Sequence, residues 1–347
     1  MAILRNSHIS SLSGSRIFVA GVGTPVGAAL AARLAATDGV IVCGGDILDA
    51  TLRNRAALEA TFVELRPTHV VVAAGRSGGI AANRRTPVDL MVDNLDVVGA
   101  VLPAAHRAGV DSLLYLASSC TYPRSSAQPM HPESLFTGPL EPTSEAYATA
   151  KLAGLVLCRA YRDQHQVRFV TGIAGDVYGP GDDFDPDNSH VVAGMIRRMH
   201  DARRRNDKSF VVWGSGRQTR DLTYVDDLAD ACVTALAHYD AREPINLSCG
   251  VGTTIAELAA TVREVVGFDG ELVFDTTRPD GAPMKVLDST SVRSLGFSPG
   301  IALREGVERT YAWFLEHVAG EPAGLQSKTL PTPDRTWGPA LAGPARG

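Results

Sequence analysis

A glycine-rich turn between a short apolar segment and an alanine-rich segment constrains the fold of this 347-residue chain more than any other feature. Apolar residues at 16–20 lead into Gly21-Val22-Gly23-Thr24-Pro25-Val26-Gly27, and apolar residues with helical spacing follow over 25–36. In such a GxGxxxG turn the backbone closes tightly and approaches a pyrophosphate, which the free N–H groups at the helix N-terminus stabilise. A glycine turn alone is also typical of a flexible loop, but the flanking strand and helix favour a dinucleotide site. The predicted binding residues in this turn are Gly21, Gly23, Thr24, Pro25, Val26 and Gly27.

Short β-branched apolar runs alternate with longer helical segments through the first half of the chain. The strand-like runs cover 16–20, 40–43, 69–74, 113–117 and 167–173. The helical segments cover 25–36, 55–65, 87–106 and 144–164. Such alternation is typical of βαβ units around a parallel sheet. We therefore predict an α/β fold with a Rossmann-type, doubly wound parallel sheet.

The character of the sequence changes after Tyr178-Gly179-Pro180. A loop rich in Asp, Pro and Asn extends to Ser189, and an arginine-rich helical segment follows from His190 to about Arg205. Helical segments at 225–238, 254–266 and 303–317 and a strand-like run at 270–274 complete the pattern, and the helix at 225–238 is expected to return to the core. We predict a tail at 1–14, a Rossmann domain at 15–180 with a return at 220–240, and a smaller C-terminal α/β substrate lobe at 181–219 and 241–318. The Pro-, Gly- and Ala-rich residues 319–347 are predicted to be a disordered tail.

Composition limits the classes of partner and the compartment. The formal net charge is -5 and like charges form no long block, so neither nucleic acid nor an anionic membrane is expected as a partner. No apolar run approaches the length of a membrane-spanning helix. The chain has no secretory signal pattern, and its cysteines have no CxxC spacing, which predicts a cytoplasmic protein with reduced thiols and no metal site. These cysteines are Cys43, Cys120, Cys158, Cys232 and Cys249.

Two further strand ends are candidates for the cofactor site. Asp46 follows the second strand, where a carboxylate would accept hydrogen bonds from an adenosine ribose and repel a 2′-phosphate, although an ordinary turn aspartate fits equally well. Ala73-Ala74-Gly75 ends the next strand, and these small residues leave room for a cofactor across the sheet edge. The same edge is where a doubly wound sheet binds its ligands.

A serine at a strand end and a tyrosine-lysine pair on a helix indicate the chemistry. Ser118 ends the strand at 113–117, and Tyr147 and Lys151 lie in the helical segment at 144–164 with i, i+4 spacing, which puts both on one face. A phenol is a poor base near neutral pH, and a lysine ammonium beside it stabilises the phenolate. Ser118 would hydrogen-bond a carbonyl or alkoxide oxygen during hydride transfer. A YxxxK pair alone also occurs on surface helices, but together with the glycine turn and the strand-end serine it predicts a nicotinamide-dependent oxidoreductase.

Longer motifs around these residues resemble those of the GDP-L-fucose synthase family, which are NADPH-dependent GDP-4-keto-6-deoxymannose 3,5-epimerase-reductases of the extended short-chain dehydrogenase/reductase superfamily. The resemblance covers most of the chain between the two predicted tails. The matching motifs are Ser118-Ser119-Cys120-Thr121-Tyr122-Pro123, Gln128-Pro129-Met130, Leu140-Glu141-Pro142-Thr143, Tyr147-Ala148-Thr149-Ala150-Lys151-Leu152-Ala153-Gly154, Asn188-Ser189-His190-Val191 and Val211-Val212-Trp213-Gly214-Ser215-Gly216.

The resemblance implies that Ser118, Tyr147 and Lys151 serve hydride transfer at C4, whereas Cys120 and His190 form the acid-base pair for epimerisation at C3 and C5. A 4-keto group acidifies the hydrogens of both neighbouring carbons, so one group removes a proton and another returns one to the opposite face. A thiol and an imidazole titrate near enough to neutrality for this work. Taken singly, Cys120 is typical of a buried core residue and His190 of a helix cap. Together in matching motifs they favour catalysis.

The resemblance also implies a substrate-binding set and a homodimer. Cations on the diphosphate and an aromatic ring near the base would come from Arg198, Trp213, Arg220 and Lys285, which otherwise fit surface charges or a packed indole. The resemblance also implies that Ser119 and Asp176 bind the substrate in the sugar pocket. A GDP-sugar is therefore the expected substrate. The helices predicted at 87–106 and 144–164 are those through which this family forms dimers.

Several positions depart from the family pattern. Gly23-Thr24, Gly44 and Asp46 stand where arginines would meet the 2′-phosphate of NADPH, so the cofactor is NAD or NADP with NAD favoured. Asp176 replaces an asparagine and Gly181 a histidine, which predicts a sugar different from that of the family.

Three functions remain open on these grounds. The first is a GDP-hexose 3,5-epimerase with reduction at C4, and the second is a redox-neutral, NAD-dependent GDP-mannose-type 3,5-epimerase. The third is a non-catalytic dinucleotide-binding sensor, against which the complete set of five catalytic candidates argues.

Overall fold

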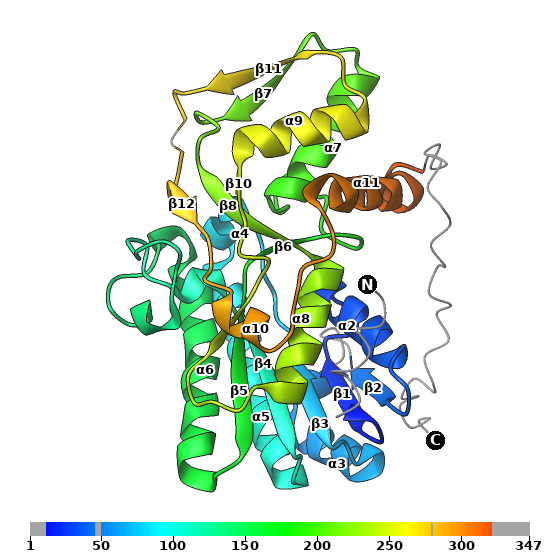
Figure 1. Ribbon diagram of the computed structural model, residues 1–347, viewed down its shortest axis with the longest axis vertical. Coiled ribbons are helices and arrows are strands. Elements are labelled where there is room, and N and C mark those ends of the chain that lie inside the picture. Colours follow the sequence, from blue (N-terminus) through cyan, green and yellow to red (C-terminus); the bar gives the residue numbers. More distant parts are fainter. Residues whose placement is uncertain (1–11, 46–49, 279, 321–347) are drawn as a thin grey trace.

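The computed structural model describes residues 12–45, 50–278 and 280–320. A large α/β lobe occupies one end of the molecule and a smaller lobe the other, as Figure 1 shows. Asp46 lies outside the described residues, as do nearly all residues of the two predicted tails. Within the described ranges, none of the helices is both long and apolar enough to cross a lipid bilayer.

The large lobe is built on a six-stranded parallel sheet, which confirms the predicted fold class. The strands run in the order β2 (Ile41–Gly45), β1 (Arg16–Ala20), β3 (His69–Val72), β4 (Ser112–Ser118), β5 (Arg168–Ala174) and β9 (Ile245–Leu247). Because β1 has β2 on one side and β3 on the other, the strand order reverses at β1. In such a sheet the ligand crevice lies at the carboxyl ends of the strands beside that reversal. The glycine turn follows β1 at this point.

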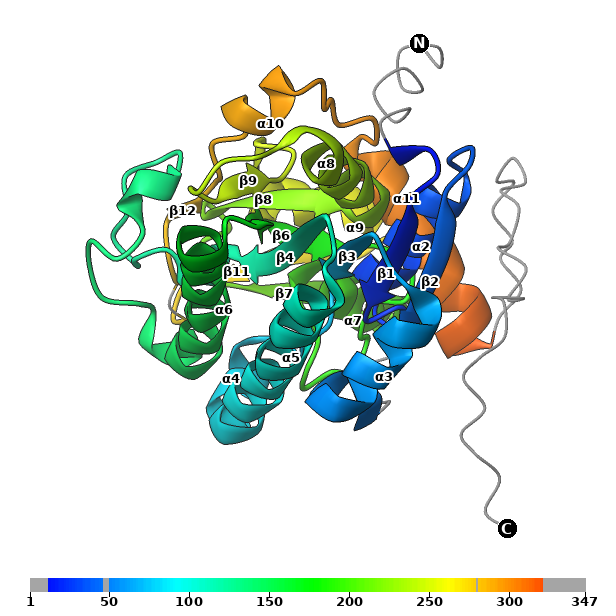
Figure 2. The same ribbon diagram turned by 90° about the horizontal axis from the view of Figure 1, so that it is seen from below.

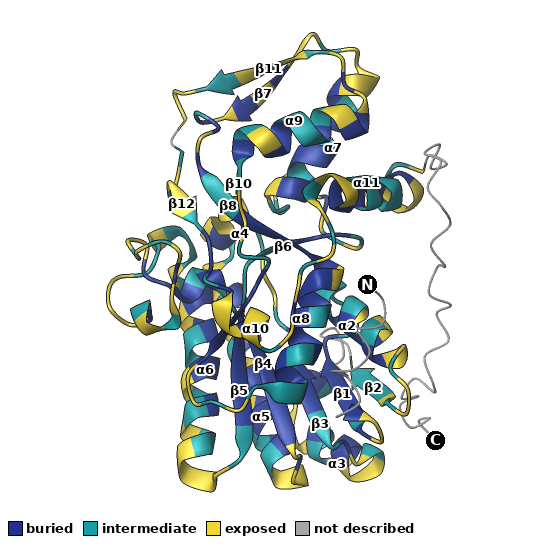
Figure 3. Cartoon of the chain, viewed as in Figure 1, coloured by how far each residue is buried: buried dark blue, intermediate teal, exposed yellow. Residues whose placement is uncertain are grey.

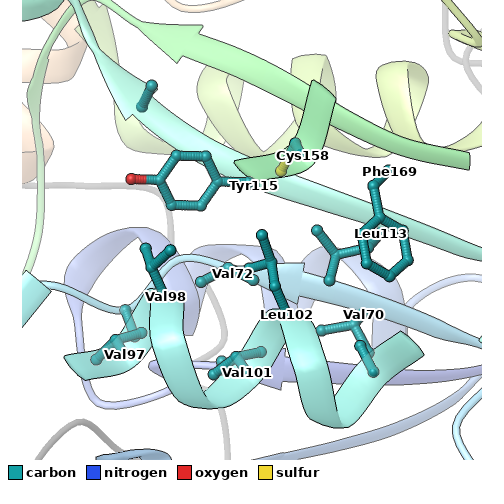
Figure 4. Packing of buried hydrophobic residues seen from close by; sticks show 14 of the residues in the cluster. Val70, Val72, Val97, Val98, Val101, Leu102, Leu113, Tyr115, Cys158 and Phe169 are labelled. Atoms are coloured by element: carbon teal, nitrogen blue, oxygen red, sulfur yellow. The ribbon is translucent and has the colours of Figure 1, made fainter. Parts of the chain in front are cut away.

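Helices cover both faces of the large sheet, and each face has its own hydrophobic core. One face carries α3 (Arg55–Leu65), α5 (Pro87–Ala108) and α6 (Glu145–His165), and the other carries α2 (Pro25–Ala35) and α8 (Val225–His238), as Figure 2 shows. Figure 4 shows Val98 and Leu102 of α5 near Val72 of β3 and Tyr115 of β4. The strands β3, β4 and β5 are buried almost throughout (Figure 3), which explains why their sequences are runs of apolar residues without alternation.

The smaller lobe has a separate core. It contains α7 (Val191–Arg204), α9 (Ile255–Val266), α11 (Leu303–Phe314) and the parallel pair β7 (Ser209–Trp213) and β11 (Glu271–Asp275). Their buried side chains, with Tyr178 and Phe184, form one hydrophobic cluster. The helix α9 begins with a capping box, in which the side chains of Thr254 and Glu257 each accept from the other's backbone N–H.

A second, small sheet lies where the two lobes meet (Figure 1). Its central strand β8 (Thr219–Tyr224) pairs with β6 (Asp176–Tyr178), β10 (Gly252–Thr254) and β12 (Met284–Lys285). These pairings join segments that are far apart in the sequence. They bring Asp176, Arg220 and Lys285 to one place.

The observed sheets divide the chain differently from the predicted boundary at residue 241. The strand β9 completes the large sheet, although its residues fall in the range that the sequence predicted for the substrate lobe. Conversely, of the predicted return at 220–240, α8 packs on the large core, whereas β8 joins the small sheet. A three-residue strand such as β9 has no periodicity of its own, so only its pairing with β5 reveals it.

Candidate active site

The glycine turn brings the end of β1 close to the start of α2. A Cβ atom at Gly27 would collide with the carbonyl oxygen of Gly21, so only glycine allows the helix to begin here. Thr24 caps α2, because its side chain accepts a hydrogen bond from the N–H of Gly27 at 3.0 Å, and Pro25 occupies the first turn. The start of α2 therefore lies at the carboxyl end of β1, where a doubly wound sheet binds its ligands.

A cleft of about 410 Å³ lies beside this turn. Its walls include Gly23–Pro25, Gly75–Ser77 and, from across the crevice, Asp183 and Asn188. Its volume is within the range of small-molecule and cofactor sites. The short helix α4 (Ile80–Arg85) closes one end, and the N–H of Gly79 donates to the carbonyl of Asn188 at 2.9 Å. Neither α4 nor its contact with the 182–189 loop was predicted from the sequence, because both depend on contacts between distant residues.

The predicted cofactor residues occupy two kinds of position. Gly23, Thr24, Pro25 and Gly75 line the cleft. The remaining residues lie behind it: Gly21, Gly27 and Ala74 are buried, and Val26 and Ala73 pack against the hydrophobic cores. A dinucleotide therefore fits this crevice by the criteria of a glycine turn, a capped helix N-terminus and an adjoining cleft.

The helix α6 presents Tyr147 and Lys151 towards the end of β4. It can lie close to β4 because Gly154 faces Tyr115, whose ring would overlap with any Cβ at residue 154. The Tyr115 hydroxyl donates to the carbonyl of Lys151 at 3.3 Å. Tyr115 and Gly154 thus fix the position of α6 against β4, a role that the sequence alone did not reveal.

Replacing Gly154 with alanine is expected to destabilise the protein by about 1 to 3 kcal/mol, because the methyl group meets the Tyr115 ring in a closely packed core. Gly99 on the exposed side of α5 is the matched control, since a Cβ there meets nothing within 4 Å. Gly99→Ala should be neutral or stabilising by up to about 1 kcal/mol. Urea denaturation measures both. Equal stability of the two variants would show that α6 moves away from Tyr115 without cost.

The predicted triad is assembled at this point. The Tyr147 phenol is buried, and burial raises its pKa above the ordinary value, whereas a hydrogen bond with Ser118 opposes the rise. The Lys151 ammonium donates to the carbonyl of Leu116 at 3.2 Å and lies 5.9 Å from the centroid of the Tyr147 ring. Burial lowers the pKa of Lys151 to about 8. In the protein alone the neutral phenol is therefore the stable form of Tyr147, which suits a group that donates a proton.

Asn94 is a site residue that was missed from the sequence. It lies on the buried stripe of α5, and its side-chain amide donates to the carbonyls of Arg76 and Leu90. Its Oδ1 atom is buried without a hydrogen-bond partner in the described part of the chain. Gly75 separates this oxygen from Lys151, since a Cβ at Gly75 would overlap Asn94 Oδ1 and lie 3.0 Å from Lys151 Nζ. A polar residue four positions after Leu90 on an apolar helix face was the available signal.

Cys120 lies beside the triad, in the turn that follows Ser118. Its backbone N–H donates to Ser118 Oγ at 3.2 Å, and its thiol is among the neighbours that raise the pKa of Tyr147 after burial. The ammonium of Lys285 lies 3.6 Å from Cys120 Sγ and 3.3 Å from Asp176 Oδ1. Ser119, by contrast, is buried, and its hydroxyl has no partner within the described residues.

His190 belongs to the other lobe, where it is the N-cap residue of α7. Its side chain makes no capping hydrogen bond, so the imidazole is not used to cap the start of the helix. Asp182 lies close enough to be affected by it. Burial raises the pKa of the Asp182 carboxyl to about 6, and the neighbouring His190 opposes that rise. Cys120, which follows β4, and His190, which precedes α7, therefore come from different lobes.

Residues 17–250 match the model of the NAD dependent epimerase/dehydratase family. The chain belongs to this family. It is 42% identical over 320 residues to GDP-L-fucose synthase 1 of Arabidopsis thaliana, covering 92% of this chain and 99% of that one. It is 43% identical over 309 residues to the GDP-L-fucose synthase of Sinorhizobium fredii, covering 89% and 98%.

A solved structure agrees with the sequence relatives. The GDP-L-fucose synthetase of Naegleria fowleri bound to NADP has a TM-score of 0.80 and 26% identity, and the match covers 89% of this chain and 96% of that one. The resemblance predicted from the motifs is thereby confirmed, and the chain is an NAD(P)-dependent enzyme.

In this epimerase/dehydratase family member, part of the predicted GDP-binding set forms a cluster on the smaller lobe. The exposed Trp213 ring has two guanidinium groups over it, Arg198 at 5.4 Å and Arg278 at 5.1 Å from the centroid. Arg278 was not among the predicted residues. Arg220 lies at the small sheet, where its guanidinium donates to the carbonyls of Thr219 and Ala282. Lys285, predicted with this set, contacts Cys120 and Asp176 instead.

Proposed function

We propose that this protein is a GDP-hexose 3,5-epimerase that acts through a 4-keto sugar and reduces it at C4 with a nicotinamide cofactor. The observation that carries the proposal is the position of Cys120 beside the buried Tyr147, at the end of the strand that bears Ser118. The triad of Ser118, Tyr147 and Lys151 would then act on a carbonyl group, and Cys120 would act on the carbon next to it. The names of the relatives, GDP-L-fucose synthases, support the same activity.

Epimerisation requires two proton carriers on opposite faces of the sugar. The hydrogens at C3 and C5 are acidic because the enolate places its charge on the C4 oxygen. Cys120 and His190, which come from different lobes, are proposed to exchange protons with the two faces. Ser118 would donate a hydrogen bond to the C4 oxygen and stabilise its developing negative charge.

Reduction at C4 uses the same oxygen. A bound reduced nicotinamide supplies the hydride. The Tyr147 phenol, whose pKa burial raises, is proposed to donate a proton to the C4 oxygen as the alcohol forms. Lys151, held by the Leu116 carbonyl, stabilises the phenolate that remains.

The nucleotide is proposed to bind at the smaller lobe. Trp213 presents an exposed aromatic face, and the cations of Arg198 and Arg278 beside it would attract a diphosphate. Arg220 and the predicted pocket residue Asp176 lie on the small sheet at the junction of the lobes. A GDP-sugar would then extend from Trp213 to Tyr147.

The activity is tested by supplying GDP-4-keto-6-deoxymannose with NADH or NADPH and following the reduced nicotinamide by absorbance. We expect stoichiometric oxidation of the cofactor and a product inverted at C3 and C5. A product reduced at C4 without inversion would contradict the epimerase half of the proposal. No consumption of either cofactor would contradict the reductase half.

A redox-neutral 3,5-epimerase is the second candidate, and the surroundings of the adenosine end favour it. Gly44 stands where the family has an arginine, and the nearby Arg53 and Arg76 are both bound by Asp93, at 2.7 and 2.9 Å. Such an enzyme would hold NAD tightly and return the same hydride. Denaturing the purified protein and identifying the released dinucleotide distinguishes the candidates, because copurified NAD with no net cofactor consumption is expected only of the second.

The cofactor preference is proposed to be NAD(H). A 2′-phosphate carries nearly two negative charges, and Asp93 already neutralises one of the two arginines that it binds. Arg55 pairs with Glu59 at 2.8 Å. Titration of the purified protein should therefore give at least about tenfold tighter binding of NADH than of NADPH, a difference of about 1.4 kcal/mol.

Tighter NADPH binding would contradict this preference. It would show that Arg53 or Arg76 leaves Asp93 for the phosphate, and Arg53→Ala and Arg76→Ala would then weaken NADPH binding selectively.

The cytoplasmic location and the homodimer stay predictions.

A further inference from the structure

Lys285 lies at the reacting end of the site, although it was expected to bind the diphosphate. It is the last residue of β12, which pairs with β8 so that Lys285 is opposite Arg220. From there its ammonium reaches the large lobe, 3.6 Å from Cys120 Sγ. On its other side it contacts Asp176 Oδ1 at 3.3 Å.

The charge state of Lys285 follows from these neighbours. Burial lowers the pKa of its ammonium, but the Asp176 carboxylate and Cys120 outweigh burial, and the result is a pKa above the ordinary value. Lys285 is therefore a cation throughout the working range. Within the described residues, the other charged or titratable groups facing this cluster are Arg220 and Asp221 on β8, the latter near Asp176, and Tyr147 on α6.

We propose that Lys285 is a positioning residue that stabilises the thiolate form of Cys120, with Asp176 holding the ammonium in place. A cation beside a cysteine favours the thiolate, which is the form that accepts a proton. The inference rests on the proposed function: when Cys120 takes a proton from C3 or C5, the C–H bond breaks, an S–H bond forms, and the C–H electron pair enters the enolate. The thiolate charge then passes to the C4 oxygen.

The pH dependence of alkylation tests this without any sugar or cofactor. The intact protein is treated with iodoacetamide across a pH series, and modification of the Cys120 peptide is followed by mass spectrometry, because the four other cysteines also react if accessible. The pH at which the alkylation rate is half-maximal reports how readily Cys120 forms a thiolate. The maximal alkylation rate at high pH reports how accessible its sulfur is to iodoacetamide.

In Lys285→Met the pH of half-maximal rate should rise by about one unit or more, so that alkylation near neutral pH slows about tenfold with the maximal rate unchanged. Lys285→Arg should keep the wild-type midpoint, because it keeps the cation. Lys208→Met, at an exposed lysine on the smaller lobe, is the matched control. Lys285→Gln gives a second neutral variant if the methionine variant does not fold.

A wild-type midpoint in a folded neutral variant would overturn the inference, as would a shift equally large in Lys285→Arg. Failure of the inference is distinguishable from failure of the proposed function. If the enzyme converts its 4-keto GDP-sugar while the midpoint is unchanged, only the role of Lys285 is wrong. If the midpoint shifts as expected in a protein without epimerase activity, the thiolate pairing stands and the function is wrong.

Discussion

In Tyr147→Phe, reduction at C4 is expected to fall by about 10² to 10⁴ fold, the usual contribution of a positioned acid-base group. The substitution removes the hydroxyl that hydrogen-bonds Ser118 and leaves the ring in the space it fills now. Binding of the dinucleotide should change little, because the cleft at the glycine turn is formed by other residues. Single-turnover oxidation of the reduced cofactor measures the chemical step, and titration of the cofactor measures the binding.

The matched control is Tyr161→Phe on the same helix. The Tyr161 ring packs against His106 and Phe169 away from the site, so its hydroxyl has no part in the proposed chemistry. This variant should react at the wild-type rate. Undiminished turnover in Tyr147→Phe, with Tyr161→Phe also normal, would remove Tyr147 from the mechanism.

The periodic elements of the fold were predictable because their local patterns agree with their packing. The segment at 225–238 is α8, and the strands at 16–20 and 69–74 appear as β1 and β3 within two residues. The helix α8 buries one apolar stripe against the large sheet, and the strands β1 and β3 bury both of their faces within the two cores beside it. Local sequence is then enough to specify the structure.

Elements defined by pairing with distant segments were not predictable. The strands β6 and β12 have three and two residues, and they exist as strands because β8 pairs with both. The same small sheet carries Asp176 and Lys285 to Cys120. That juxtaposition depends on three chain segments more than 50 residues apart, so motif matching placed Lys285 with the diphosphate cations instead.

The grouping of the candidate catalytic residues was predictable to the extent that neighbouring positions on one element carry them. Tyr147 and Lys151 lie one turn apart on α6, and Ser118 ends the strand beside it, so spacing alone located the triad. Asn94 comes from α5 and lies beside Lys151 across Gly75, whereas Tyr115 lies on β4 and contacts α6 at Gly154 and at the Lys151 carbonyl. Their roles depend on close backbone approach, which a single sequence does not reveal.

The epimerisation step gives the second large effect. In Cys120→Ser and in His190→Asn, incorporation of solvent deuterium at C3 or C5 of a 4-keto GDP-sugar is expected to fall by at least about 10² fold. A serine hydroxyl ionises far less readily than a thiol, and an asparagine amide does not titrate near neutral pH. Proton transfer to or from the carbon then lacks its partner on one face.

Reduction at C4 separates this loss from a general collapse of the site. Hydride transfer depends on Ser118, Tyr147 and Lys151, which stay in place on β4 and α6, so it should remain measurable in both variants. His165→Asn, at the exposed end of α6, and Cys43→Ser, in β2, are the controls, because neither side chain faces the triad.

The two single variants should also differ from each other. Because Cys120 and His190 come from different lobes, each replacement should block proton transfer on its own face of the sugar. If both variants exchange C3 and C5 hydrogens at the wild-type rate, Cys120 and His190 are structural, and the proton carriers lie elsewhere in the site.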